Sequence, residues 1–74
     1  MNGSLPPRVA YLIEAAFALV EGWETRPIPR AQWHRADDYM VAAALIADDA
    51  SVMEAWERLA LQYERSEQWL VVSE

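Results

Sequence analysis

The 74-residue chain contains no cysteine and no lysine, and it has only two glycines and one histidine. The lack of cysteine excludes disulfide bridges and metal sites built from thiolates. Glycine occurs only at positions 3 and 22, which excludes a glycine-rich phosphate-binding loop. The serines lie at the ends of expected helices, and none shares an element with the histidine, so a nucleophile–base pair has little support. We therefore predict that the protein is not an enzyme and that it binds no cofactor and no metal ion.

Long hydrophobic runs are also missing. The longest uncharged apolar runs include AAFALV and YMVAAALIA, and both are far shorter than the roughly 20 residues that a membrane-spanning helix needs. The first residues, MNGSLPPR, do not have the basic and then apolar order of a secretory signal, and two prolines interrupt them. We expect a cytoplasmic protein without a membrane segment.

Positive charge is scarce, because twelve acidic residues stand against six arginines and the net charge is −6. An acidic surface repels phosphate backbones, and binding by counterion release needs clustered cations. Nucleic acid is therefore not the expected partner. One basic stretch, Arg26–Arg35, keeps an alternative open, because Trp33 and His34 lie among its arginines. Such a segment can grip single-stranded nucleic acid by charge and stacking or pair with carboxylates. A dimeric regulator that contacts nucleic acid through this segment is the second functional hypothesis.

What the chain has in excess is hydrophobic surface. Hydrophobic residues make up 54% of the sequence, and four residues are tryptophans. A chain of this length buries only about 60% of the surface that its unfolded form exposes. Three apolar stretches, VAYLIEAAFALVEGW, YMVAAALIA and VMEAWERLALQY, supply more than one small core can cover. We infer that part of this surface contacts another chain.

Periodicity and helix-breaking residues predict three helices in a single domain that spans residues 1–74. The expected helices lie near residues 6–23, 30–48 and 51–68. Prolines at positions 6 and 7 are tolerated at a helix start, and Gly22 is typical of a helix end. The segment 26–29 contains two prolines, so it is expected to be a stiff connector and not part of a helix.

The third expected helix has the clearest local signals. Ser51 and Glu54 have the spacing of a capping box, and apolar residues between Val52 and Tyr63 follow one stripe of a helix. The short apolar tail at 69–74 follows. Its periodicity does not distinguish a helical extension, a short strand and an apolar clip, because the run is too short.

Two groups of acidic residues are candidate sites. His34, Asp37 and Asp38 share one face of the second expected helix, a spacing that suits a divalent ion or a histidine acting as a general base. A metal would need a further ligand, so we expect a polar first turn near the positive end of the helix dipole, with metal-dependent activity as a third hypothesis. Asp48 and Asp49 lack the pattern of a calcium-binding loop, and a solvated turn is expected there.

The aromatic residues divide into core candidates and binding candidates. Phe17, Trp56 and Tyr63 lie on apolar stripes and are expected in the core. Tryptophan and tyrosine dominate binding hot spots, because each gives a large and stiff contact. Trp23, Trp33, Tyr39 and Trp69 lie at element ends or on mixed faces, where a place at the rim of the core and a role as partner anchor are both open. The predicted partner-binding residues are Trp33, Tyr39 and Trp69, with Arg30 and Arg35 as polar partners.

These observations predict an all-α protein, a small three-helix bundle that a homodimer with two-fold symmetry completes. The functional hypothesis is a small acidic protein without enzymatic activity that binds and modulates another protein. Inhibitors, adaptors and antitoxin-like regulators work in this way, and compact inhibitors encoded by phages or other mobile elements have a similar size and character.

Overall fold

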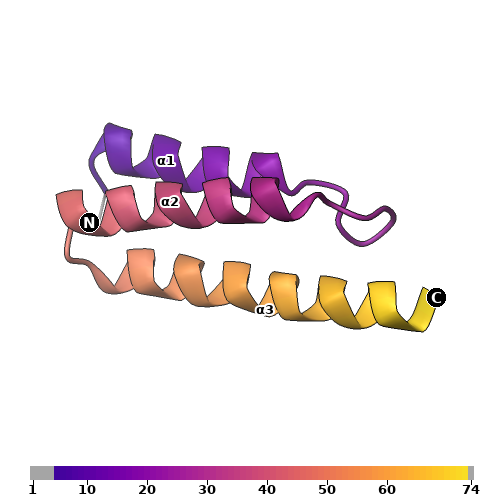
Figure 1. The fold of residues 1–74 in the computed structure, drawn as a ribbon. Helices are drawn as coiled ribbons and strands as arrows, with labels where there is room; N and C mark the ends of the chain where they lie inside the picture. Colours follow the sequence, from indigo (N-terminus) through magenta and orange to yellow (C-terminus); the bar gives the residue numbers. More distant parts are fainter. Residues whose placement is uncertain (1–4, 74) are drawn as a thin grey trace.

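The computed structural model describes the backbone of residues 5–73 and the side chains of residues 5–67. Within this part the chain forms three helices and no strand: α1 (Pro7–Leu19), α2 (Arg30–Ile46) and α3 (Ala50–Ser73). Each helix runs antiparallel to the one before it, and α1 and α3 both lie alongside α2 (Figure 1). The bundle is elongated, with extents of 45 × 18 × 16 Å. These features confirm the predicted all-α three-helix fold, whereas dimerisation stays a prediction.

The first helix is shorter than predicted. α1 begins at Pro7, where the missing backbone N–H has no cost because the first turn has no acceptor for it. The helix ends at Leu19 and not near residue 23, because its last turn tightens: the Val20 N–H donates to the Phe17 carbonyl oxygen at 3.2 Å. Gly22 then has a φ of +86°, a left-handed conformation that ends the helical geometry. Gly22 thus belongs to the turn that follows the helix.

The connector of residues 20–29 is tied down by two side chains. Arg26 donates from Nη2 to the carbonyl oxygen of Glu21 at 2.9 Å. Gln32, in the first turn of α2, donates from Nε2 to the carbonyl oxygen of Leu19 at 3.0 Å. Between these two contacts Ile28 is buried in the core. The connector therefore fixes how the end of α1 meets the start of α2.

The second helix follows the prediction closely. Pro29 has extended backbone angles (φ −55°, ψ 141°), so α2 begins at Arg30. The helix ends at Ile46 and not at residue 48, because Ala47 is extended (φ −135°, ψ 115°). The short link that follows brings the chain directly into α3 (Figure 1).

The third helix begins with a cap that differs from the predicted one. The Ser51 N–H donates to Asp49 Oδ1 at 2.7 Å, and the Val52 N–H donates to the Asp49 carbonyl oxygen at 3.0 Å. Asp49 is therefore the N-cap. The predicted capping box of Ser51 and Glu54 is wrong, because the helix starts at Ala50 and already includes Ser51. Aspartate and serine are comparable as N-caps, so sequence alone did not separate the two.

The third helix is also longer than predicted. It continues to Ser73, so the backbone of the tail is a helical extension, the first of the three possibilities above. No glycine or proline follows residue 68 to end the helix there. The side chains from residue 68 onward lie outside the described part of the chain.

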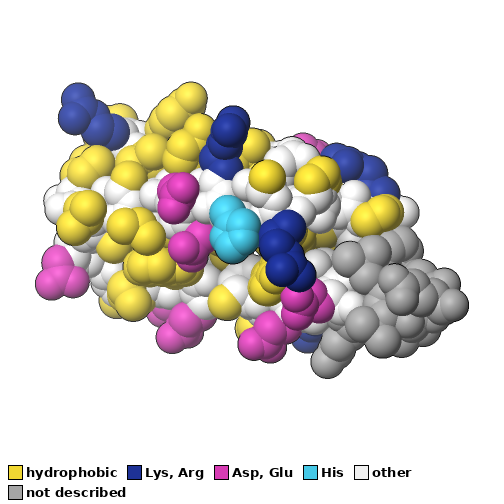
Figure 2. Space-filling view, viewed as in Figure 1, with side chains coloured by type: hydrophobic (Ala, Val, Ile, Leu, Met, Phe, Trp, Pro, Cys, Tyr) yellow, Lys and Arg dark blue, Asp and Glu magenta, His cyan; other side chains and the backbone are white. Residues whose placement is uncertain are grey.

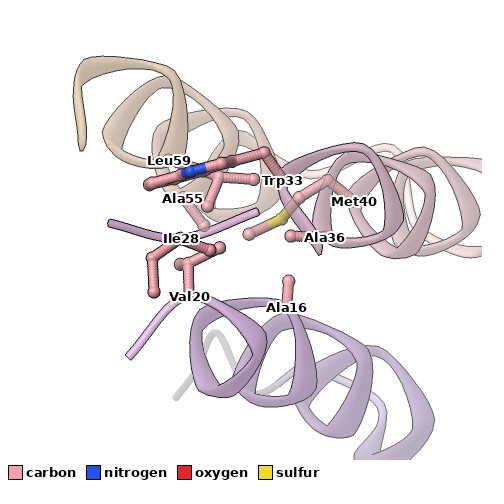
Figure 3. Close-up of a cluster of buried hydrophobic side chains, with 8 residues drawn as sticks. All are labelled: Ala16, Val20, Ile28, Trp33, Ala36, Met40, Ala55 and Leu59. Atoms are coloured by element: carbon pink, nitrogen blue, oxygen red, sulfur yellow. The ribbon is translucent and has the colours of Figure 1, made fainter. Parts of the chain in front are cut away.

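Buried side chains from all three helices and the connector form the main core. Its members are Ala16, Val20, Ile28, Trp33, Ala36, Met40, Ala55 and Leu59. Figure 3 shows Met40 and Trp33 reaching from α2 into the space between the helices. The alanines let α1 and α2 approach closely, and the flexible Met40, which is fully buried, fills the remaining irregular space. A smaller cluster of Val9, Ala43 and Val52 closes the end of the bundle near the link between α2 and α3.

Candidate binding face

A pocket of about 270 Å³ lies between α2 and α3. Its walls are Trp33, His34 and Asp37 from α2 and Trp56, Leu59, Ala60 and Tyr63 from α3. His34, Asp37 and Ala60 are exposed, whereas Trp33 and Leu59 are buried, so the pocket opens to solvent above a floor of core residues. Pockets for drug-sized ligands are larger, at roughly 300 to 1,000 Å³. This pocket has the size for one side chain of a partner.

Two contacts hold the pocket walls in place. Trp56 donates from Nε1 to Asp37 Oδ1 at 2.7 Å, a short distance that is typical of a hydrogen bond to a charged acceptor. The rings of Trp33 and Tyr63 meet edge to face, with centroids 5.3 Å apart and an interplanar angle of 65°. Both contacts join α2 to α3. The aromatic walls and the carboxylate are therefore positioned by the packing of the two helices.

An ion pair lies next to the pocket, beside Tyr63. Arg30 Nη2 lies 3.8 Å from Glu67 Oε2. The pKa of Tyr63 is raised, first by the hydrogen bond of its hydroxyl group to Glu67 and also by partial burial, although the nearby Arg30 opposes the rise. Both Arg30 and Glu67 are largely exposed, so this ion pair adds little to stability.

Exposed apolar side chains lie on α2 and α3 between the pocket and the link that joins these helices. Val41 is 37% exposed, Leu45 82% and Met53 47%. On α2, the spacing of His34, Asp37, Val41 and Leu45 (i, i+3, i+7, i+11) places them on one side of the helix. On α3, Met53, Trp56 and Ala60 (i, i+3, i+7) likewise share the side that lines the pocket.

We name these seven residues the α2–α3 face. Figure 2 shows hydrophobic side chains, in yellow, gathered over the end where α2 leads into α3. Acidic side chains, in magenta, and the histidine, in cyan, lie beside this apolar area. The face thus combines an exposed apolar patch, a pocket with aromatic walls and negative charge.

The predicted partner-binding residues are spread over different surroundings. Trp33 is only 6% exposed, so most of its ring belongs to the core and the rest to the pocket floor. Tyr39 is half-buried against the main core, and Arg30 pairs with Glu67. Arg35 is exposed, and neither it nor Tyr39 lines the pocket. The side chain of Trp69 lies outside the described residues.

The acidic candidates are also placed by the structure. Asp37 accepts the indole hydrogen bond of Trp56, and Asp49 caps α3. Within residues 5–67, no three histidine, aspartate or glutamate side chains are close enough to hold a metal ion. In the basic stretch, Arg26 is bound to a carbonyl oxygen of its own chain and Arg30 to a carboxylate, which leaves fewer cations for a phosphate backbone.

Sequence reasoning missed the central contact of this face. Trp56 and Asp37 are 19 residues apart and lie on different helices, so no local pattern connects them. Trp56, Phe17 and Tyr63 were expected in the core, and all three are half-buried and packed against it. The signal for the exposed apolar patch was present in the run from Val41 to Ala47, which has no polar side chain to turn toward solvent.

Comparison with protein families, with curated proteins and with solved structures finds no match to this chain. Among the helices of the described part, none combines the length and the apolar character needed to cross a membrane. The α2–α3 face is therefore the feature of this chain that indicates a function.

Proposed function

We propose that this protein has no enzymatic activity of its own and binds another protein through the α2–α3 face. This binding modulates the activity or the assembly of the partner. The observation that carries the proposal is the exposure of Leu45, 82%, within a group of exposed apolar residues. Single exposed leucines are ordinary, but contiguous apolar patches mark interaction sites. Val41 and Leu45 lie one helical turn apart on α2, Met53 lies on the pocket side of α3, and hydrophobic side chains gather at this end of the bundle (Figure 2).

The charge of the protein restricts the chemistry of the partner. Asp37 and Asp38 are exposed next to the apolar patch, and the whole chain carries a net charge of −6. A complementary partner surface is apolar at its centre and basic around it. Long-range attraction between opposite charges would raise the association rate of such a pair. An inhibitor, an adaptor and an antitoxin-like regulator all fit this mode of binding.

Two leucines offer a matched test. Leu45 and Leu61 are both exposed, at 82% and 54%, but Leu61 follows Ala60 and therefore points about 100° away from it around α3. The protein is used to capture its partner from the cells that make it, and binding of the purified partner is then measured by calorimetry. We expect Leu45→Glu to abolish binding, because a charge would be buried in an apolar contact. We expect Leu61→Glu to bind like the wild type.

One result of this test would contradict the proposal. If Leu61→Glu loses binding while Leu45→Glu keeps it, the binding surface lies elsewhere on α3. Circular dichroism of both variants checks that the helices are retained. Substitutions at such exposed positions change the free energy of unfolding by about 0.5 kcal/mol or less, so both variants should fold.

A further inference from the structure

We propose that the pocket between α2 and α3 binds an arginine side chain of the partner protein. This inference rests on the proposed function and specifies which group of the partner the α2–α3 face recognises. The aromatic walls of the pocket, the carboxylate that Trp56 holds there and the size of the pocket point to this ligand.

The aromatic walls suit a cation. Trp33, Trp56 and Tyr63 all line the pocket, and aromatic rings attract a guanidinium or ammonium group through the negative charge on their faces. The fold already uses this interaction elsewhere, because the guanidinium carbon of Arg58 lies 4.9 Å from the centre of the Phe17 ring. The same contact between a partner arginine and the pocket needs no unusual chemistry.

Asp37 supplies the opposite charge. Its Oδ1 atom accepts the Trp56 indole hydrogen, but a carboxylate has two oxygens and room for several hydrogen bonds. Within the side chains that the structure describes, no arginine pairs with Asp37; the ion pair found there joins Arg30 and Glu67. A cation in the pocket would therefore meet a fixed carboxylate that has acceptor capacity left.

The surrounding charges also allow a cation to enter. Arg30 is the positive group near Tyr63, and its charge is offset by Glu67 at 3.8 Å. The net charge of −6 adds a general attraction for basic groups.

Arginine fits better than lysine or an apolar side chain. The guanidinium group is planar, stacks on aromatic faces and is less strongly hydrated than an ammonium group, so its transfer into an aromatic pocket costs less. An apolar side chain would remove water from Asp37 without giving it a new hydrogen bond, which is unfavourable. The volume of about 270 Å³ is enough for one such side chain.

The test uses small analogues and needs no partner protein. The purified 74-residue chain is titrated with N-acetyl-arginine-methylamide, with the corresponding lysine compound and with the norleucine compound, and proton–nitrogen spectra are recorded. The indole N–H resonance of Trp56 is the direct probe, because this group donates to Asp37. We expect the resonance to shift saturably with the arginine compound, with a Kd on the order of 1 mM. The lysine compound should bind more weakly, and the norleucine compound should show no saturable binding.

Two neighbouring aspartates give the matched control. Asp37→Asn keeps an oxygen that can accept the Trp56 hydrogen bond but removes the charge, and we expect arginine to bind about ten-fold more weakly, because a charge-assisted contact becomes a neutral one. Asp38→Asn removes the same charge from a residue that does not line the pocket. We expect Asp38→Asn to bind arginine nearly as the wild type does.

Three results would overturn the inference. They are equal binding of norleucine and arginine, binding of lysine as tight as that of arginine, and equal effects of Asp37→Asn and Asp38→Asn. None of these results bears on whether Leu45→Glu abolishes partner binding. The failure of the arginine pocket is therefore distinguishable from the failure of the α2–α3 face as a binding surface.

Discussion

At the scale of single residues, the structure shows which polar groups have defined roles and which are only solvated. Asp37 and Asp49 each accept a specific side-chain hydrogen bond, and the pKa of Tyr63 is raised by its interaction with Glu67. The sequence marks all three as polar or aromatic positions, but their partners are set by the three-dimensional arrangement. Two of these contacts lead to predictions that separate the observed role from the expected one.

The cap of α3 is tested by two alanine variants. We expect Asp49→Ala to lower the free energy of unfolding by about 1 kcal/mol, the usual cost of losing an N-cap. Ser51→Ala should change it by less than about half of that amount, because Ser51 enters this cap through its backbone N–H. Urea denaturation measures both values. A larger loss for Ser51→Ala would restore the capping box and contradict the observed cap.

The raised pKa of Tyr63 predicts a loss of stability in alkaline solution. The hydrogen bond to Glu67 favours the protonated phenol in the folded state, so the folded protein holds this proton more tightly than the unfolded chain does. The stability it contributes is fully present below the ordinary pKa of about 10 and is lost as the pH rises through the folded-state pKa. Above pH 10, we expect the thermal midpoint of Tyr63→Phe to fall less steeply with rising pH than that of the wild type. The control variant, Tyr11→Phe, should follow the wild type.

At the scale of helices, the sequence predicted more of the fold than of the binding face. The prolines at 27 and 29 placed the connector correctly, because they bias the backbone away from helix whatever the tertiary contacts are. The ends of α1 and α3 were misplaced, because Val20, Asp49 and the residues after 68 had no comparably strong local signal. Trp33 was predicted to be a partner anchor, with the rim of the core as the alternative, and its side chain is buried, since its place depends on how α3 packs over α2.

The burial of Trp33 predicts a large effect on the packing of α2 against α3. Trp33 contributes to the main core and contacts Tyr63 across the two helices. We expect Trp33→Ala to cost about 3 to 5 kcal/mol, which is most of the stability of a small domain. Leu45→Ala, on the exposed part of the same helix, should cost about 0.5 kcal/mol or less. A Trp33→Ala variant with an unchanged melting temperature would show that Trp33 is a surface anchor.

At the scale of the whole molecule, the excess of apolar residues inferred from composition has a location. The large exposed apolar side chains in the described part are Tyr11, Val41, Leu45, Ile46, Met53 and Leu61. Several of them cluster where α2 leads into α3, because α2 has an apolar stretch on more sides than two neighbouring helices can cover. The predicted homodimer and the proposed partner would then compete for the same surface.

The exposed apolar surface leads to a prediction for the oligomeric state of the isolated protein. Without its partner, we expect the wild type to sediment as a dimer at micromolar concentration, because a second copy can cover the exposed apolar residues. Leu45→Glu should sediment as a monomer, and Leu61→Glu should resemble the wild type. A monomeric wild type would remove the homodimer from the account and leave the partner as the only occupant of the face.

The most direct test of the binding face is photo-crosslinking in the cells that make the protein. A photoreactive phenylalanine analogue replaces Leu45, and in matched variants Leu61 or Tyr11, which are also exposed. We expect a covalent adduct with a different protein from position 45 and little or none from positions 61 and 11. Adducts that form mainly from positions 61 or 11, or a position 45 that labels only a second copy of the chain, would contradict it.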